Sequence, residues 1–205
     1  MPTYLITGTN RGIGLEYVRL LAKDSNNTIL ATVRSSSSST TDLKKVASDK
    51  THILTCDTGN IEDIKNLPSQ VSKALGEGKK IDVLINNAAI NAQPEQTSLS
   101  ITAEALSEHM KINVYGPAKT VQYLLEAGLS AENAKVVNMT SGLGSMKVSL
   151  GITPRKCATY SISKAAVNSL TVQQSGELRE HLGKCVVVCV DPGWYVLPFK
   201  HETER

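Results

Sequence analysis

Short apolar runs alternate along this chain with longer segments of helical periodicity. The runs are rich in β-branched residues and almost continuous in hydrophobicity, which is typical of strands buried on both faces of a sheet. Strands that alternate with helices favour a doubly wound parallel sheet of the α/β class. The predicted strands are residues 4–7, 28–33, 52–55, 83–86, 136–139 and 186–190.

The helical segments fall between these strands, and the chain length of 205 residues suits one hydrophobic core. Neither an internal repeat nor a linker divides the sequence, so we expect a single domain over residues 1–205. The serine run at 35–39 is interpreted as a flexible loop. The predicted helices are residues 12–23, 42–48, 61–75, 103–110, 114–127 and 161–182.

Composition and charge exclude several classes of function. The net charge of +3 comes from scattered Lys and Arg residues, so we expect no nucleic-acid partner. No apolar run approaches the ~20 residues of a membrane helix, and the first residues do not form a secretory signal. The four cysteines lack metal-binding or CxxC spacing, which predicts free thiols, no metal site and a cytoplasmic location.

A glycine-rich loop follows the first predicted strand and opens the first predicted helix. A helix N-terminus offers unpaired N–H groups and the positive end of a dipole, which together attract phosphate. Gly8 allows a tight turn, Gly12 lets the backbone approach a pyrophosphate, and Gly14 allows close packing of helix on strand. This context predicts a dinucleotide site rather than an ordinary turn.

Further landmarks follow in a fixed order, and together they resemble the short-chain dehydrogenase/reductase family. The amino-acid sequence of the N-terminal third is most similar to that of small carbonyl reductases of the Sniffer and C-factor kind. The resemblance implies a Rossmann-type NAD(P)-binding domain over residues 1–193, with an atypical tail at 194–205. The landmarks are Thr7-Gly8-xxx-Gly12-Ile13-Gly14, Asn86-Asn87-Ala88-Ala89, Asn113, Ser141, Tyr160-xxx-Lys164 and Pro192-Gly193.

The end of the second strand bears on the choice of dinucleotide. A site for NAD places an acidic side chain there to bind the ribose hydroxyls, whereas this chain has Arg34. Arg34 and Arg11 can hold the 2′-phosphate of NADP between two guanidinium groups. We therefore expect NADP(H) as the cofactor.

The resemblance implies further cofactor contacts. Asp57 is expected to bind the adenine amino group, although an acid before the helix at 61–75 also suits a helix cap. Asn86 and Asn87 are expected to contact the adenosine ribose and support the central strand, and a local turn role is the alternative. The remaining cofactor positions are Asn10, Ile13, Ala88, Pro192 and Gly193, together with Tyr160 and Lys164.

Tyr160 and Lys164 are spaced i and i+4 on a predicted helix, so they share one face. A nearby ammonium lowers the pKa of a phenol, which can then exchange a proton with a substrate oxygen. Ser141 is expected to polarise the carbonyl from the end of its strand. The resemblance implies that Asn113 holds a water that supplies protons to Lys164, and it also suits an N-cap near residue 114. These residues predict an NADPH-dependent carbonyl reductase, or an alcohol dehydrogenase in reverse.

The segment between Ser141 and Tyr160 is expected to form one wall of an apolar substrate pocket. Cys157 within it is interpreted as a pocket or core thiol, because no histidine flanks it, and the four histidines are assigned no role. The residues of this wall are Gly142, Leu143, Met146, Val148, Leu150, Ile152 and Cys157.

Only twelve residues follow Pro192-Gly193, where the family usually continues further. Val196 and Leu197 stand where the family places a threonine that binds the nicotinamide amide. The lid and a seventh strand are expected to be missing, which leaves strand 186–190 as an apolar edge. Either the natural chain ends here, or the reading frame enters an unspliced intron after Gly193. The alternative function is a catalytically impaired dinucleotide-binding module.

The last expectation concerns assembly. Helices 114–127 and 161–182 carry apolar residues on more than one stripe, and one stripe suffices to cover a sheet. In the resembling family these helices pair across a two-fold axis, so we expect a homodimer and no tetramer. The alternative is that the small residues Ala165, Ala166 and Ser169 pack inside one subunit.

Overall fold

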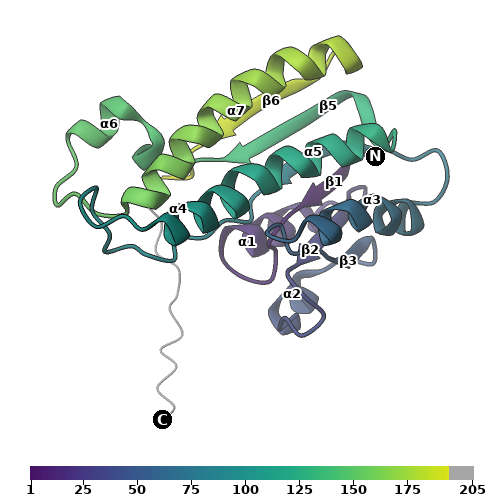
Figure 1. Ribbon diagram of the computed structural model, residues 1–205. Helices are drawn as coiled ribbons and strands as arrows, with labels where there is room; N and C mark the ends of the chain where they lie inside the picture. The colour runs from purple at the N-terminus through teal and green to yellow at the C-terminus, as the bar shows by residue number, and fades with distance from the viewer. Residues whose placement is uncertain (194–205) are drawn as a thin grey trace.

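The computed structural model describes residues 1–193, and the expectations for Val196, Leu197 and the rest of the tail lie outside this range. Six parallel strands form one sheet in the order β3-β2-β1-β4-β5-β6 (Figure 1). The order reverses between β1 and β4, which confirms the predicted doubly wound α/β sheet. The strands are β1 (Thr3–Ile6), β2 (Thr28–Val33), β3 (Thr51–Thr55), β4 (Ile81–Asn86), β5 (Ser130–Met139) and β6 (Val186–Val190).

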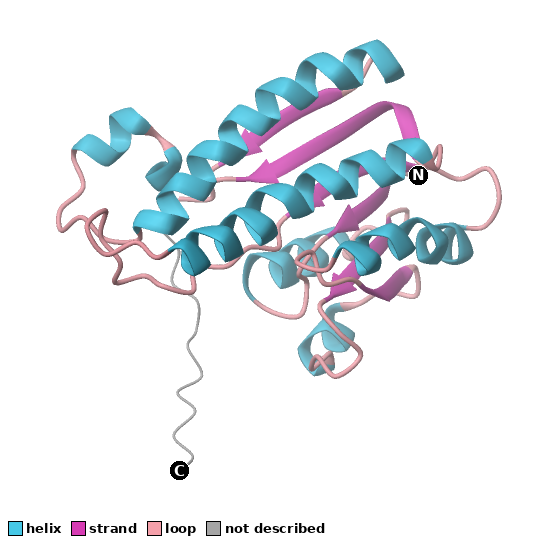
Figure 2. Ribbon diagram, viewed as in Figure 1, coloured by secondary structure: helices cyan, strands magenta, loops and turns pink. Residues whose placement is uncertain are grey.

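Helices flank the sheet on both sides, as the cyan and magenta elements of Figure 2 show. Helices α1 (Gly12–Leu21) and α2 (Thr41–Val46) lie against one face. Helices α3 (Ile61–Leu75), α5 (Gly116–Glu126) and α7 (Ala158–Leu182) cover the other. The shorter helical segments are α4 (Ala103–Met110), η1 (Lys111–Tyr115), η2 (Gly142–Gly144) and α6 (Met146–Leu150).

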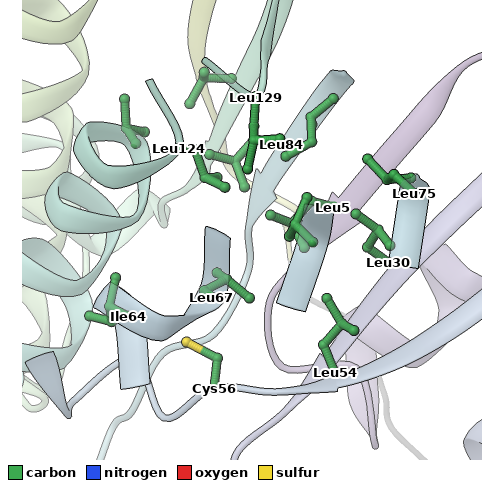
Figure 3. Close-up of a cluster of buried hydrophobic side chains, with 14 of the residues drawn as sticks. Leu5, Leu30, Leu54, Cys56, Ile64, Leu67, Leu75, Leu84, Leu124 and Leu129 are labelled. Atoms are coloured by element: carbon green, nitrogen blue, oxygen red, sulfur yellow. The ribbon is translucent and has the colours of Figure 1, made fainter. Parts of the chain in front are cut away.

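Alternation along the central strands divides the core into two clusters. Leu5 and Leu30 face α3, α5 and α7 (Figure 3), whereas Ile6 and Ile29 face α1 and α2. Successive side chains of a strand point to opposite faces, so strands covered on both sides need apolar residues at nearly every position. This explains the continuous apolar runs in the sequence.

Most predicted elements are confirmed within two or three residues, and β5 differs most. It begins at Ser130 rather than at residue 136, because the more polar residues 130–135 extend the strand beyond its buried apolar part. Ser130 pairs with Ile81 of β4, across a register shift. Helix α7 begins at Ala158 rather than at residue 161, so Tyr160 lies in its first turn.

The helix around Asn113 also differs from the prediction. The chain is helical from Ala103 to Glu126, and Asn113 lies inside the π-helical segment Lys111–Tyr115 between α4 and α5. The expected N-cap role of Asn113 is therefore wrong. Pro117, four residues later, has no N–H to donate to the carbonyl of Asn113, and the wider π-helical turn lies at this break in the α-helical pattern.

Strand β6 forms the edge of the sheet within residues 1–193. Val187 is buried against the α7 side, whereas Val186, Val188 and Val190 are 45%, 40% and 36% exposed. The apolar edge expected from the sequence is thus present in the described part of the chain. Every helix in this part is too short or too polar to span a lipid bilayer.

Candidate active site

A cleft of about 820 Å³ opens at the carboxyl ends of the strands, beside the point where the strand order reverses. Ligands of open α/β sheets bind at this place. Most residues singled out from the sequence meet there, although they come from the ends of six strands and from helix α7. The predicted site residues that line the cleft are Gly8, Asn10, Arg11, Gly12, Ile13, Arg34, Asp57, Asn87, Ala88, Ser141, Tyr160, Lys164, Pro192 and Gly193.

The glycine loop crosses the bottom of this cleft. Gly8 and Gly12 have φ of 71° and 63°, in the left-handed region that favours glycine. A Cβ on Gly8 would lie 3.1 Å from Ala88, so the loop also needs glycine for space. Helix α1 begins here without a side-chain cap and without an acidic residue in its first turn. Its first N–H groups are therefore available to an anion.

Thr7 and Asn87 tie the glycine loop to the end of β4. The Thr7 hydroxyl accepts hydrogen bonds from the backbone nitrogens of Asn87 and Ala88, each at 3.0 Å. The Asn87 amide nitrogen donates to the carbonyls of Thr7 and Gly8 at 2.8 and 3.0 Å. Asn87 thus shapes the loop, a contact that spacing alone did not predict.

Arg11 and Arg34 both line the cleft and are exposed, so their guanidinium groups are accessible to a ligand. The serine run after Arg34 is a hydrogen-bonded turn rather than an irregular loop. The Ser38 nitrogen donates to the Ser35 carbonyl at 3.0 Å, and the hydroxyls of Ser35 and Ser37 lie 2.8 Å apart. The end of β2 therefore combines a cation with several hydroxyl groups.

Asp57 lines the cleft after β3 and does not cap α3. Its Oδ1 accepts from the Gly59 nitrogen at 2.8 Å, whereas Asn60 caps the helix by accepting from Glu62 at 3.0 Å. The alternative of a helix cap is thus wrong for Asp57, and the residue lines the cleft.

Tyr160 and Lys164 lie one turn apart on α7, and both line the cleft. Lys164 is only 3% exposed, and its Nζ donates to the Met139 carbonyl at 2.7 Å. The same Nζ lies 5.5 Å from the centroid of the Tyr160 ring. Burial lowers the pKa of Lys164 from 10.5 to about 8, because desolvation disfavours the ammonium form.

Ser141 follows β5 and stands at the start of η2. Its hydroxyl accepts from the Leu143 nitrogen at 3.2 Å and lines the same end of the cleft as Tyr160. A carbonyl bound between Ser141 and Tyr160 can therefore meet two hydroxyl donors. This arrangement suits polarisation of the carbonyl together with proton transfer.

Three predicted site residues lie behind the cleft wall instead. A Cβ on Gly14 would come within 2.7 Å of the Asn87 amide nitrogen, so Gly14 serves close packing, as expected. Asn86 is 4% exposed and donates to the side chain of Asn138 at 2.8 Å, which places it within the sheet and outside the cleft lining, so it supports the central strands. Asn113 is 1% exposed and bonds to Ile90 and Ser163.

His109 anchors the cleft wall, although the sequence analysis assigned it no role. It is fully buried, and its Nδ1 lies 2.7 Å from the Ala105 carbonyl. Its Nε2 accepts from the Ala92 nitrogen at 3.2 Å. Asn113, four residues later, holds both the nitrogen and the carbonyl of Ile90. The i, i+4 spacing of two polar residues on an otherwise buried helix face was the signal for this pair.

The wall between Ser141 and Tyr160 is only partly as predicted. Leu143, Val148, Ile152 and Cys157 line the cleft, together with Gly142. The expectation is wrong for Met146 and Leu150, which are 78% and 76% exposed on α6 and do not line the cleft. Helix α6 buries none of its residues, so its sequence position did not decide which side chains face inward.

The four cysteines are free thiols. Burial, with smaller contributions from Asp63 and Asp57, raises the pKa of Cys56 to about 12, so its thiol stays protonated. Residues 1–193 contain no group of three or more His, Cys, Asp or Glu side chains arranged to hold a metal ion.

Comparisons with known proteins agree with this geometry. The short chain dehydrogenase family profile matches residues 2–204. The NADPH-bound carbonyl reductase from chicken fatty liver is 31% identical, with a TM-score of 0.82 over 95% of this chain and 80% of that one. The carbonyl reductase Sniffer of Caenorhabditis elegans is 28% identical, with a TM-score of 0.82 over 95% and 85%. The short-chain dehydrogenase/reductase AacuF of Aspergillus aculeatus is 30% identical over 94% of this chain and 74% of its own.

Proposed function

The chain belongs to the short-chain dehydrogenase family, and we propose that within it this protein is an NADPH-dependent reductase of carbonyl compounds. The observation that carries the proposal is the convergence of Ser141, Tyr160 and Lys164 at one end of a cleft whose other end holds Arg11 and Arg34. Chemistry and cofactor recognition thus share one cavity of suitable size. The reverse reaction, oxidation of an alcohol, uses the same groups.

The cleft fits a dinucleotide. The uncapped N-terminus of α1 and the positive φ of Gly8 and Gly12 form a cradle in which a pyrophosphate can approach the backbone. Asn10, Ile13 and Ala88 complete its lower wall, and Pro192 and Gly193 close it after β6. When bound, the nicotinamide supplies the hydride.

Two observations support NADP(H) over NAD(H). Arg34 stands at the end of β2 where a site for NAD has a carboxylate, and Arg11 lines the same cavity. The chicken carbonyl reductase binds NADPH, and a Burkholderia multivorans short-chain dehydrogenase/reductase that is 26% identical was solved with bound NADP. Asp57, after β3, is the proposed contact for the adenine amino group.

We assign the proton to the Tyr160 hydroxyl, which gives it to the substrate oxygen as hydride reaches the carbon. Lys164 favours the phenolate that remains, since its ammonium lies over the Tyr160 ring. Ser141 orients the carbonyl. Asn113 holds Ile90 and Ser163, and the expected water relay to Lys164 through Asn113 stays a prediction.

We propose a homodimer through α5 and α7. Val121 and Leu124 of α5 are buried within the subunit, so this apolar stripe of α5 already packs against the core and is not available to a partner. Helix α7, by contrast, exposes Ile162 and Val172 at 43% and 71%. A partner is expected to cover them, because such a face is costly in water. We propose no nucleic-acid or membrane partner.

The test is NADPH oxidation with a panel of quinones, diketones and aldehydes. Turnover of any of them supports the proposal. Tight NADPH binding without turnover would instead support a catalytically impaired dinucleotide-binding module. The sequence feature that favours this second function is Val196 and Leu197 in place of the family's threonine.

A further inference from the structure

Charged side chains line both ends of the cleft. Arg11, Arg34 and Asp57 follow β1, β2 and β3, toward one edge of the sheet, whereas Asp191 follows β6 at the opposite edge, where Lys164 of α7 also lines the cavity. The end that holds Ser141 and Tyr160 therefore carries an acidic group, Asp191, to which the proposed cofactor contacts assign no role.

The position of the Asp191 carboxylate is defined on one side by its own turn. Its Oδ1 accepts from the Gly193 nitrogen at 3.0 Å. Its Oδ2 lies 3.2 Å from the point that a Cβ on Gly142 would occupy, and Val148 Cγ1 lies 3.4 Å from that point. Gly142 directly follows Ser141. The Asp191 carboxylate and the apolar Val148 side chain thus both lie against Gly142, the residue next to the proposed carbonyl-orienting Ser141.

Within residues 1–193, no cation pairs with Asp191. Among residues 1–193, Lys164 is the only other charged side chain that lines this end of the cleft, and its Nζ donates to the Met139 carbonyl. Lys156 pairs with Glu95 at 2.6 Å and Arg155 donates to the Leu150 carbonyl at 3.0 Å, and neither lines the cleft. Within the described part of the chain, the Oδ2 atom therefore has no hydrogen-bond partner and can accept one from a ligand.

We propose that Asp191 determines substrate specificity by accepting a hydrogen bond from an ammonium or other N–H donor on the carbonyl substrate. The substrate class is then an apolar ketone or aldehyde with a basic nitrogen, and keto acids are disfavoured by repulsion. This inference rests on the proposed function, because it places the substrate carbonyl between Ser141 and Tyr160. Leu143, Val148 and Ile152 contact the apolar part of the same molecule.

The experiment uses three aryl ketones of one scaffold that carry an aminomethyl group, a neutral ethyl group or a carboxylate. The full chain and its Asp191→Asn variant are compared by kcat/KM with saturating NADPH. Asparagine keeps the acceptor for Gly193 and removes the charge. We expect the full chain to prefer the ammonium ketone over the carboxylate by about tenfold or more, and the variant to lose most of this preference.

The control is Asp49→Asn, which makes the same chemical change in an exposed turn before β3, at the amino edge of the sheet. This variant should keep the roughly tenfold preference in kcat/KM for the ammonium ketone over the carboxylate ketone. An equal ratio in the full chain and in Asp191→Asn would overturn the inference. A weaker affinity for NADPH in Asp191→Asn, with the ketone ratio unchanged, would also overturn it, because Asp191 would then serve the cofactor.

Failure of the proposed function has a different signature. If none of the ketones is turned over, the reductase proposal fails, and equilibrium binding of the same three ketones to the NADPH-loaded chain still measures the charge preference. Tighter binding of the ammonium ketone that disappears in Asp191→Asn supports the role of Asp191. Indifference to charge in that assay refutes it.

Discussion

The ammonium of Lys164 lies over the ring of Tyr160, 5.5 Å from its centroid, while it donates to the carbonyl of Met139. The cation is thus held by the end of β5. A buried cation in this position favours negative charge on Tyr160. It is also costly to the fold, and this cost can be measured.

Stability should increase with pH through the titration of Lys164. The pKa is about 8 in the folded chain and 10.5 when exposed, so the unfolded state binds more protons between these values. The unfolding free energy of the natural chain should therefore rise relative to Lys164→Met by about 1 kcal/mol from about pH 7 to about pH 9. Urea unfolding at both pH values checks this. If the difference in unfolding free energy between the natural chain and Lys164→Met is the same at both pH values, burial does not lower the pKa of Lys164.

Replacing Tyr160 with Phe should abolish turnover by removing the proton donor, with a loss of about a hundredfold or more. NADPH affinity should change little, because the ring and its packing are retained. Steady-state kinetics and fluorescence titration of NADPH separate the two effects. Undiminished turnover would refute the assigned role. Tyr17 does not line the cleft, and its hydroxyl contacts the sulfur of Met139, so Tyr17→Phe is the matched control for removal of a phenol hydroxyl.

Arg34→Asp should shift the preference from NADPH toward NADH. The change removes a cation from the proposed 2′-phosphate site and places a carboxylate where ribose hydroxyls can bind. We expect NADPH affinity to fall by about tenfold or more, while NADH affinity rises or stays constant. Arg19→Ala, on the exposed side of α1 and paired with Glu16, should leave both affinities unchanged. Tighter NADH binding by the natural chain would contradict the assignment of NADP.

His109→Leu should destabilise the chain by about 1–3 kcal/mol, because the fully buried imidazole loses its hydrogen bonds to the Ala105 carbonyl and the Ala92 nitrogen. The apolar replacement keeps most of the volume, so the loss measures the hydrogen bond rather than a cavity. Urea unfolding gives the free energy. His109→Gln retains an acceptor and should recover part of the loss, whereas equal losses in both variants would assign His109 to packing alone.

Val172→Glu should convert the proposed dimer to a monomer, since a charge in the centre of an apolar interface remains desolvated. Sedimentation at micromolar concentration should show a mass twice 22.0 kDa for the natural chain and 22.0 kDa for the variant. Leu99→Glu, at a position 97% exposed outside the helices, should leave the mass unchanged. If the natural chain is a monomer, the proposed interface is wrong. If it is a tetramer, the chain must have a second interface besides the one proposed.

The strands and the cleft lining could be predicted because they depend on local pattern and on topology. A parallel sheet brings all its strand ends to one edge, so Arg34, Asp57 and Ser141 meet in the cleft whatever their sequence separation. The residues behind the wall could not be placed in this way. Asn86 and Asn87 are neighbours in sequence, yet one faces Asn138 and the other the glycine loop, because β4 ends at Asn86 and Asn87 already lies in the turn that follows it.

Long-range partners account for the remaining misses. The role of His109 depends on Ala92, which lies in a loop whose path no periodicity describes. The exposed positions of Met146 and Leu150 depend on how α6 sits over the cleft. The π-helical turn at Asn113 follows from Pro117 only once the helix is known to run through that region.

The strand order also governs when the cleft can come into existence during folding. Tyr4 of β1 pairs with Val83 of β4, and Lys135 of β5 pairs with Val186 of β6. The strand ends that line the cleft are therefore brought together by contacts between segments that are distant in the chain. Such non-local pairings form slowly, because a long loop must close before any contact repays its entropy. Asp191, Pro192 and Gly193 reach the cavity only after β6 has docked. After dilution from denaturant, NADPH affinity should therefore recover more slowly than the circular-dichroism signal of the helices. The slower recovery reports the docking of β6 onto β5.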